Sequence, residues 1–123
     1  MSETKKILIA DDTANGRELV KTVLENSGYE VFEAKDGLEA LASARQLHPD
    51  LIILDLHMPG LDGFGVIETL RKESAFEKTP VMALTASAMM GDKERAMALG
   101  FTGYVTKPIR LAALRSEVTR LLG

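Results

Sequence analysis

Five short apolar runs alternate along this chain with longer segments of helical period, and this alternation constrains the fold more than any other feature. Such a pattern is typical of repeated strand and helix units that assemble into a mainly parallel sheet. We expect strands near residues 6–11, 29–34, 50–55, 80–85 and 102–106, and helices near 14–27, 37–47, 63–73, 88–99 and 110–122. The pattern therefore predicts an α/β fold with five strands and five helices.

The composition of the runs predicts the order of the strands. A strand that is buried on both faces of a parallel sheet reads as continuous apolar sequence, whereas an edge strand tolerates alternation. The first, third and fourth runs are continuous, while 29–33 and 102–106 carry polar or small residues between apolar ones. The order 2-1-3-4-5 satisfies this pattern with right-handed crossovers. We therefore expect a doubly wound, flavodoxin-like parallel sheet and a single domain over 1–123.

Composition excludes several classes of protein. A net charge of −3 argues against a nucleic-acid-binding surface, and Arg110, Arg115 and Arg120 are spaced so that they point to different sides of a helix. The chain has no cysteine, which excludes a disulfide scaffold and thiolate chemistry. Neither a signal peptide nor a membrane-spanning stretch is present in the sequence. We expect a cytoplasmic protein that contacts neither nucleic acid nor membrane.

Polar side chains follow four of the apolar runs, at the point where each run ends. Asp11 and Asp12 follow the first run, Asp55 ends the third, Thr85 ends the fourth and Lys107 follows the fifth. In an open parallel sheet the carboxyl ends of neighbouring strands border one crevice. Three carboxylates, a hydroxyl and an ammonium group suit a divalent cation together with an anion. This set is what phosphoryl transfer onto a carboxylate requires.

Helix punctuation accounts for other polar residues and glycines. Asp36, with Glu39 three residues later, resembles a capping box, and Asp62 is placed to cap the third helix. Gly28 and Gly100 suit left-handed helix ends. We assign these residues to structure.

Four stretches of the sequence carry a resemblance to a known family. They are IADD at 9–12, DLIILDLHMPGLDG at 50–63, ALTA at 83–86 and YVTKP at 104–108. In this order they resemble the response-regulator receiver domain, the phosphoacceptor half of two-component signalling. The resemblance covers nearly the whole chain and implies a CheY-like fold of the stand-alone or hybrid-kinase type. The stretch 13–19 is more similar to hybrid-kinase receivers than to those of transcription factors.

The resemblance implies a role for each residue of the crevice. Asp55 would be phosphorylated, and Asp11 and Asp12 would hold Mg²⁺, or alternatively Mn²⁺, together with Asp55 and the backbone carbonyl of His57. Three ionised carboxylates give a charge of −3, while Mg²⁺ and Lys107 give +3, so the unphosphorylated site is close to neutral. A carboxylate is already ionised at neutral pH and needs no general base. The chain would catalyse only its own phosphorylation and dephosphorylation, and is not otherwise expected to be an enzyme.

The resemblance further implies that Thr85 contacts the phosphoryl group, that Lys107 pairs with it, and that Thr85 and Tyr104 form the switch. The Lys107–Pro108 peptide bond would be cis. Taken singly, Thr85 is equally a β-branched strand residue, Lys107 a surface charge and Tyr104 a packing aromatic. For the Asp11–Asp12 pair the alternative is a helix cap with a solvated neighbour, although Thr13 is available to cap the first helix instead.

Two further positions are expected to tune dephosphorylation. His57 either leans over the phosphoryl site, where it would slow the attack of water, or faces solvent. Ser87, two residues after Thr85, is the second tuning position. His48 precedes Pro49 in a predicted loop and has no metal-ligand spacing to His57, so we expect no chemical role for it.

The methionines suggest where a partner binds. Met82 is expected in the core and Met97 is expected to pack inward, while Met89 and Met90 are the candidates for a partner-facing surface. In the resembled family the fourth helix, fifth strand and fifth helix form the output face. Because the fifth helix reaches Leu122, we expect signalling in trans to an effector.

We therefore expect a Mg²⁺-dependent phosphoacceptor that takes phosphate from a sensor histidine kinase or a histidine phosphotransfer protein. The alternative is a receiver-like binding module that acts without phosphorylation. A flavodoxin-like cofactor binder is disfavoured because Asp11 and Asp12 would repel a cofactor phosphate. A haloacid-dehalogenase-type phosphatase is disfavoured because it places a second aspartate two residues after its nucleophile, where this chain has His57.

Overall fold

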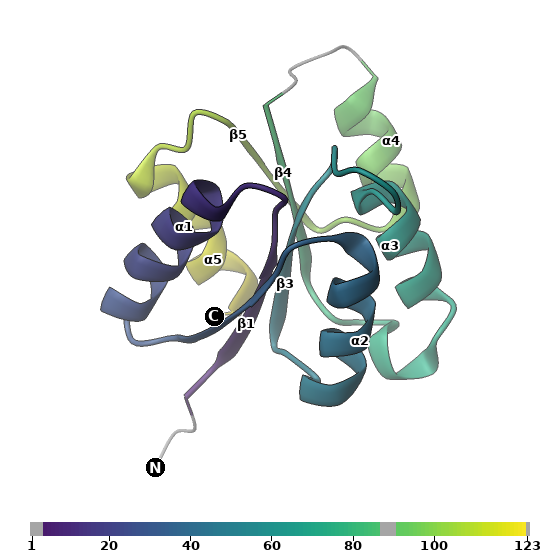
Figure 1. Ribbon diagram of the computed structural model, residues 1–123, viewed down its shortest axis with the longest axis horizontal. Helices are drawn as coiled ribbons and strands as arrows, with labels where there is room; N and C mark the ends of the chain where they lie inside the picture. Colours follow the sequence, from purple (N-terminus) through teal and green to yellow (C-terminus); the bar gives the residue numbers. More distant parts are fainter. Residues whose placement is uncertain (1–3, 87–90, 123) are drawn as a thin grey trace.

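The fold was analysed in a computed structural model, which describes residues 4–86 and 91–122. The elements are β1 (Lys6–Ala10), α1 (Ala14–Asn26), β2 (Glu30–Ala34), α2 (Gly37–Leu47), β3 (Leu51–Asp55), α3 (Gly63–Arg71), the short 3₁₀ helix η1 (Ser74–Phe76), β4 (Val81–Thr85), α4 (Asp92–Leu99), β5 (Gly103–Thr106) and α5 (Leu111–Leu122). They follow the predicted alternation of strands and helices (Figure 1). The described part of the fourth helix begins at Asp92, later than the expected residue 88.

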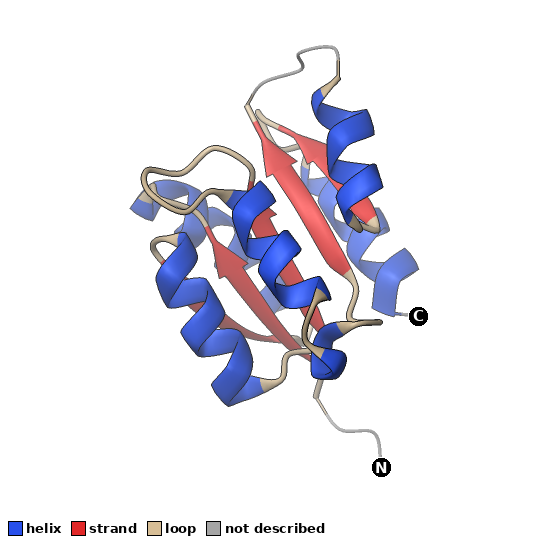
Figure 2. Cartoon of the chain, turned by 90° about the vertical axis from the view of Figure 1, so that its right-hand side faces the viewer, coloured by secondary structure: helices blue, strands red, loops and turns tan. Residues whose placement is uncertain are grey.

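The five strands form one parallel sheet in the order β2-β1-β3-β4-β5, as predicted. Helices α1 and α5 cover one face of the sheet, and α2, α3 and α4 cover the other (Figure 1). The strand arrows in Figure 2 point toward the same edge of the sheet. The carboxyl ends of all five strands therefore lie at the same end of the sheet.

Two apolar cores, one on each face, explain why the inner strands read as continuous apolar sequence. Leu8 and Ile52 pack in the core under α2 and α3, whereas Ile7 and Ile53 pack with residues of α1 and α5. All four side chains are fully buried. Burial of such a side chain contributes roughly 1.5–3 kcal/mol relative to leaving it in water. Strands that are stabilised from both faces hold their carboxyl ends in fixed positions.

Asp36 and Asp62 cap helices as predicted. The carboxylate of Asp36 accepts a hydrogen bond from the Glu39 N–H at 2.8 Å, and that of Asp62 accepts one from the Gly65 N–H at 2.9 Å. The reciprocal half of the predicted capping box is displaced by one residue. The Glu39 carboxylate accepts from the Lys35 N–H at 3.1 Å, one residue before the N-cap Asp36.

Gly28 and Gly100 adopt positive φ angles of 97° and 110° at the ends of α1 and α4, as predicted. His48 lies at the end of α2 with φ of 47°, and its ring stacks on Phe76 at 5.5 Å between centroids. His48 lies outside the helix, in the connection that follows α2, as predicted. Its packing against Phe76 is structural.

Met82 is fully buried in β4, as predicted, but the prediction for Met97 is wrong. Its side chain is 45% exposed, because Ala96 is the buried position of α4 and Met97 follows it on the outward side. Met89 and Met90 lie outside the described residues. Across the described part of the chain, no helix has both the length and the apolar character needed to span a membrane.

Candidate functional site

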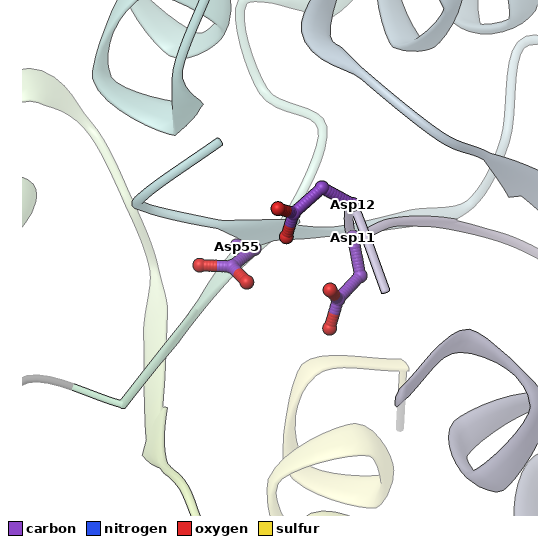
Figure 3. Close-up of side chains that lie close together, drawn as sticks. All are labelled: Asp11, Asp12 and Asp55. Carbon is purple, nitrogen blue, oxygen red and sulfur yellow. The ribbon is translucent and has the colours of Figure 1, made fainter. Parts of the chain in front are cut away.

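Asp11, Asp12 and Asp55 gather at the carboxyl ends of β1 and β3 (Figure 3). One carboxylate oxygen from each residue lies within 4.8 Å of the others. The strand register explains this proximity, because Ala10 pairs with Leu54 in adjacent strands and the aspartates come directly after. Asp11 and Asp55 are buried, while Asp12 is exposed. The cluster therefore has a buried base and one side open to solvent.

Lys107 reaches into this cluster from the end of β5. Its ammonium nitrogen donates to Asp11 Oδ2 and to Asp55 Oδ2, both at 2.9 Å. Its backbone N–H donates to the carbonyl oxygen of Thr85 at 2.7 Å, and the peptide bond to Pro108 is cis. Thr85 is fully buried at the end of β4. The structure thus brings the ammonium group and all three carboxylates together, with Thr85 bonded to the backbone of Lys107.

Asp55 is held between Lys107 and the loop that follows β3. Its Oδ1 atom accepts a hydrogen bond from the His57 N–H at 2.9 Å, while Oδ2 accepts from Lys107. Burial raises the pKa of Asp55, and the negative charge of Asp11 adds to this effect. The hydrogen bonds from Lys107 and His57 oppose the rise without cancelling it. The pKa of Asp55 therefore lies above its usual value even with Lys107 beside it.

Asp11 behaves in the opposite way. Burial alone raises its pKa, but hydrogen bonds from Thr13 and Lys107 outweigh burial, so the pKa of Asp11 lies below its usual value. The Thr13 N–H and hydroxyl both donate to Asp11 Oδ1, at 2.9 Å and 3.0 Å. Thr13 precedes α1 but its side chain makes no capping bond there. The hydroxyl that we expected to cap the helix is therefore used to orient Asp11.

The cluster fits a hard divalent cation. Carboxylate oxygens are the ligands that Mg²⁺ and Mn²⁺ prefer, and Mg²⁺ keeps several of its waters. With its carboxylates ionised, the group of Asp11, Asp12, Asp55 and Lys107 carries a net charge of −2. The exposed carboxylate of Asp12 leaves the cluster accessible from solvent. These residues therefore have the donor atoms, the charge and the access that such an ion requires.

Two residues near Asp11 were not predicted from the sequence. A Cβ atom at Gly16 would lie 2.6 Å from Thr13 Oγ1 and 2.7 Å from Asp11 Oδ2, so only glycine leaves room for them. Arg17 donates from Nη1 to the carbonyl oxygen of Asp11 at 2.7 Å. Glycine is unfavourable within a helix by about 1 kcal/mol, which is the one sequence signal for Gly16.

His57 is turned toward the start of α4. Its Nε2 atom lies 3.3 Å from Asp92 Oδ2, and its ring packs edge-on against Phe64 at 6.2 Å. The side chain is about half exposed, which agrees more with the solvent-facing alternative than with a ring enclosed in the site. Ser87, the other predicted tuning position, lies outside the described residues.

Tyr104 is half-buried on β5 and packs against the core on the α4 side of the sheet. The ammonium nitrogen of Lys93 lies 5.9 Å from the centre of its ring. Burial raises the pKa of Tyr104, and the charges of Asp92 and Glu94 raise it further. The residue is therefore a neutral aromatic between β5 and α4.

Comparison with known proteins identifies the family. The family model described as the response regulator receiver domain matches residues 7–119. The polar-differentiation response regulator DivK of Brucella ovis is 38% identical over 120 residues, which cover 98% of each chain. The Vibrio cholerae chemotaxis protein CheY4 has a similar structure, with a TM-score of 0.93, 36% identity and coverage of 98% of this chain and 100% of that chain.

A second solved structure is informative about the metal. The receiver domain of sensor histidine kinase PA1611 from Pseudomonas aeruginosa, with a TM-score of 0.90 and 30% identity, covers 98% of this chain and 99% of that chain. That structure contains a magnesium ion coordinated in its active-site cleft. The fold and the acidic cluster define a signalling module of the CheY-like class. The chain belongs to the response regulator receiver domain family of two-component signalling.

Proposed function

We propose that this chain, as one domain over residues 1–123, is a Mg²⁺-dependent phosphoacceptor whose modified residue is Asp55. The observation that carries the proposal is the position of Lys107. Its ammonium group contacts Asp55 and Asp11 at 2.9 Å, beside the exposed carboxylate of Asp12. A partly buried cation held by two carboxylates is suited to pair with a phosphoryl group that is added to one of them.

The reaction needs little covalent work from the protein. A carboxylate oxygen of Asp55 attacks the phosphorus atom of a phosphohistidine, the P–N bond breaks, and an acyl phosphate forms on Asp55. Charge on the transferred group is taken by the Lys107 ammonium and the Thr85 hydroxyl. Mg²⁺ held by Asp11, Asp12, Asp55 and the His57 carbonyl would neutralise the remaining charge. The buried hydrogen bonds of Asp55 fix its orientation for in-line attack.

Transfer of phosphate would come from a sensor histidine kinase or a histidine phosphotransfer protein, and the signal would pass in trans to an effector. Both DivK and CheY4, to which the chain is similar, are described as response regulators. The output surface that we propose is the face formed by α4, β5 and α5. Tyr104 lies on this face between β5 and α4, so a change at Thr85 that alters its packing would reach the surface.

The proposal is tested by incubation of the protein with acetyl phosphate, with and without Mg²⁺, followed by intact mass spectrometry. We expect one phosphoryl group per chain when Mg²⁺ is present, and none in the Asp55→Asn variant. Glu68→Gln, an exposed acid on α3, is the control and should react like the parent. A folded parent protein that takes up no phosphate would instead favour a binding module that acts without phosphorylation.

A further inference from the structure

The outer edge of β5 is a second notable part of the structure, and it lies apart from the acidic cluster. β5 pairs with β4 on one side only and ends the sheet. Backbone groups of a strand point alternately to its two sides. The Lys107 N–H bonds to Thr85 in β4, so the N–H groups of Tyr104 and Thr106 face the open edge. Such an edge is a template for pairing with another strand.

Glu117 and Arg120 of α5 cover part of this edge. Glu117 Oε2 accepts a hydrogen bond from the Tyr104 N–H at 3.3 Å, and Arg120 Nη2 donates to the Thr102 carbonyl oxygen at 2.8 Å. The two side chains are also joined to each other by two hydrogen bonds, at 2.8 Å and 3.0 Å. One bidentate ion pair therefore satisfies one acceptor and one donor of the strand.

This arrangement imitates one residue of a sixth strand. In a parallel sheet, one residue of the neighbouring strand makes two hydrogen bonds around the residue that lies opposite to it. Its N–H donates to the carbonyl of the residue before that opposite residue, and its carbonyl accepts from the N–H of the residue after it. The Thr102 carbonyl and the Tyr104 N–H flank Gly103 in this way. A Cβ atom at Gly103 would lie 2.8 Å from Glu117 Oε2, so glycine allows the pair to approach the backbone.

The edge is self-complementary once the pair is removed. Residues 102–106 carry no charged side chain and are rich in β-branched and aromatic residues. Two copies that meet antiparallel about Tyr104 would join the Tyr104 backbone groups to each other and the Thr102 carbonyl to the Thr106 N–H of the other copy. A groove of about 190 Å³ lies beside this edge, and its lining includes Tyr104, Thr106, Arg110 and Glu117.

We propose that the Glu117–Arg120 pair closes the β5 edge against a second copy of this chain, and that opening the pair allows two copies to join through residues 102–106. The groups that the pair occupies are the same ones that the antiparallel dimer needs. The contact is isologous and closed, so it gives a dimer and not a fibre. The proposal goes beyond phosphorylation of Asp55 and does not depend on it.

The test is analytical ultracentrifugation of the double variant Glu117→Ala, Arg120→Ala over a series of concentrations. We expect its weight-average mass to rise toward twice that of the monomer, while the parent chain stays monomeric. Arg115→Ala, an exposed arginine on the same helix, is the matched control and should leave the mass unchanged. Thr106→Lys added to the double variant should restore the monomer, because charge at a strand edge opposes pairing.

Circular dichroism establishes that each variant is folded, and Arg120→Ala alone, which removes an exposed side chain, is the milder variant if the double change unfolds the chain. It should give a weaker dimer. Folded variants that remain monomeric at every concentration would overturn the proposal. A dimer that persists with Thr106→Lys, or that forms equally in Arg115→Ala, would also overturn it.

Discussion

The ammonium nitrogen of Lys107 lies 2.9 Å from Asp55 Oδ2, although 52 residues separate the two in the chain. The same nitrogen contacts Asp11 at 2.9 Å, so one cation spans the ends of β1 and β3 from the end of β5. Hydrogen bonds between ionised groups are about twice as strong as neutral ones. This contact ties the outer strand of the sheet to the predicted phosphoacceptor.

Replacement of Lys107 by alanine should slow phosphorylation by acetyl phosphate by about 100-fold, the loss that follows removal of one charge-stabilising donor. The protein should still bind Mg²⁺, because its three carboxylates remain. The rate of phosphate uptake, followed by intact mass, is the measurement. Lys72→Ala, an exposed lysine at the end of α3, is the control. A Lys107→Ala variant that reacts at the parent rate would remove Lys107 from the mechanism.

Asp55→Asn should stabilise the metal-free protein near neutral pH by about 1 kcal/mol, the usual size of a stabilising substitution. Burial raises the pKa of Asp55, so the folded protein retains this proton at pH values where the unfolded chain has lost it. The stabilisation that this proton provides is complete below the pKa of Asp55 in the unfolded chain. It is lost as the pH rises through the pKa of Asp55 in the folded protein. The asparagine variant avoids that loss.

The stability difference between Asp55→Asn and the parent should therefore grow from acid to neutral pH. Urea denaturation in the presence of EDTA, over this range of pH, gives both free energies of unfolding. Glu18→Gln, an exposed acid on α1, makes the same change of charge and serves as the control. A difference that shrinks toward neutral pH would contradict the assigned direction of the Asp55 pKa.

Mg²⁺ should raise the thermal stability of the protein, because an ion that binds only the folded state shifts unfolding by mass action. The gain is about 2.7 kcal/mol when the free ion is at about 100 times its dissociation constant. Asp12→Asn should reduce the effect by removing the exposed carboxylate, while Glu18→Gln should not. Thermal unfolding with increasing MgCl₂ provides the measurement, and equal shifts for both variants would exclude Asp12 as a ligand.

Gly16→Ala should weaken Mg²⁺ binding even though alanine favours the helix by about 1 kcal/mol. The added Cβ atom would lie 2.7 Å from Asp11 Oδ2 and 2.6 Å from Thr13 Oγ1, which forces the Asp11 carboxylate to move. Isothermal titration with MgCl₂ compares the variant with Asn15→Ala, an exposed neighbour on α1. Unchanged affinity in Gly16→Ala would mean that the position of Asp11 is less constrained than the packing indicates.

The order of the strands was predictable because burial on both faces requires continuous apolar sequence, and the site residues followed because parallel strands end at one edge. Contacts made by side chains across the fold were not predictable in this way. The Thr13 hydroxyl bonds to Asp11 instead of capping α1, and Met97 faces outward because Ala96 takes the inward position. Both outcomes depend on which neighbour is nearest in space, and local patterns carry no such information.

The Glu117–Arg120 pair illustrates the same limit. In the sequence it reads as an ordinary i, i+3 ion pair on an exposed helix, worth a few tenths of a kcal/mol. Its role as a cover for β5 depends on the packing of α5 beside Gly103, which brings Glu117 Oε2 to the backbone of Tyr104. Only the three-dimensional structure places these groups together.

The most direct test of the account is to locate the phosphoryl group. Borohydride reduction converts an aspartyl phosphate into homoserine, which peptide mass spectrometry can assign to one position. After treatment with acetyl phosphate and Mg²⁺, we expect homoserine at the position of Asp55, and none when Mg²⁺ is left out. Homoserine at another aspartate, or at no position in a protein that is folded and binds Mg²⁺, would contradict the assignment of Asp55 as the phosphoacceptor.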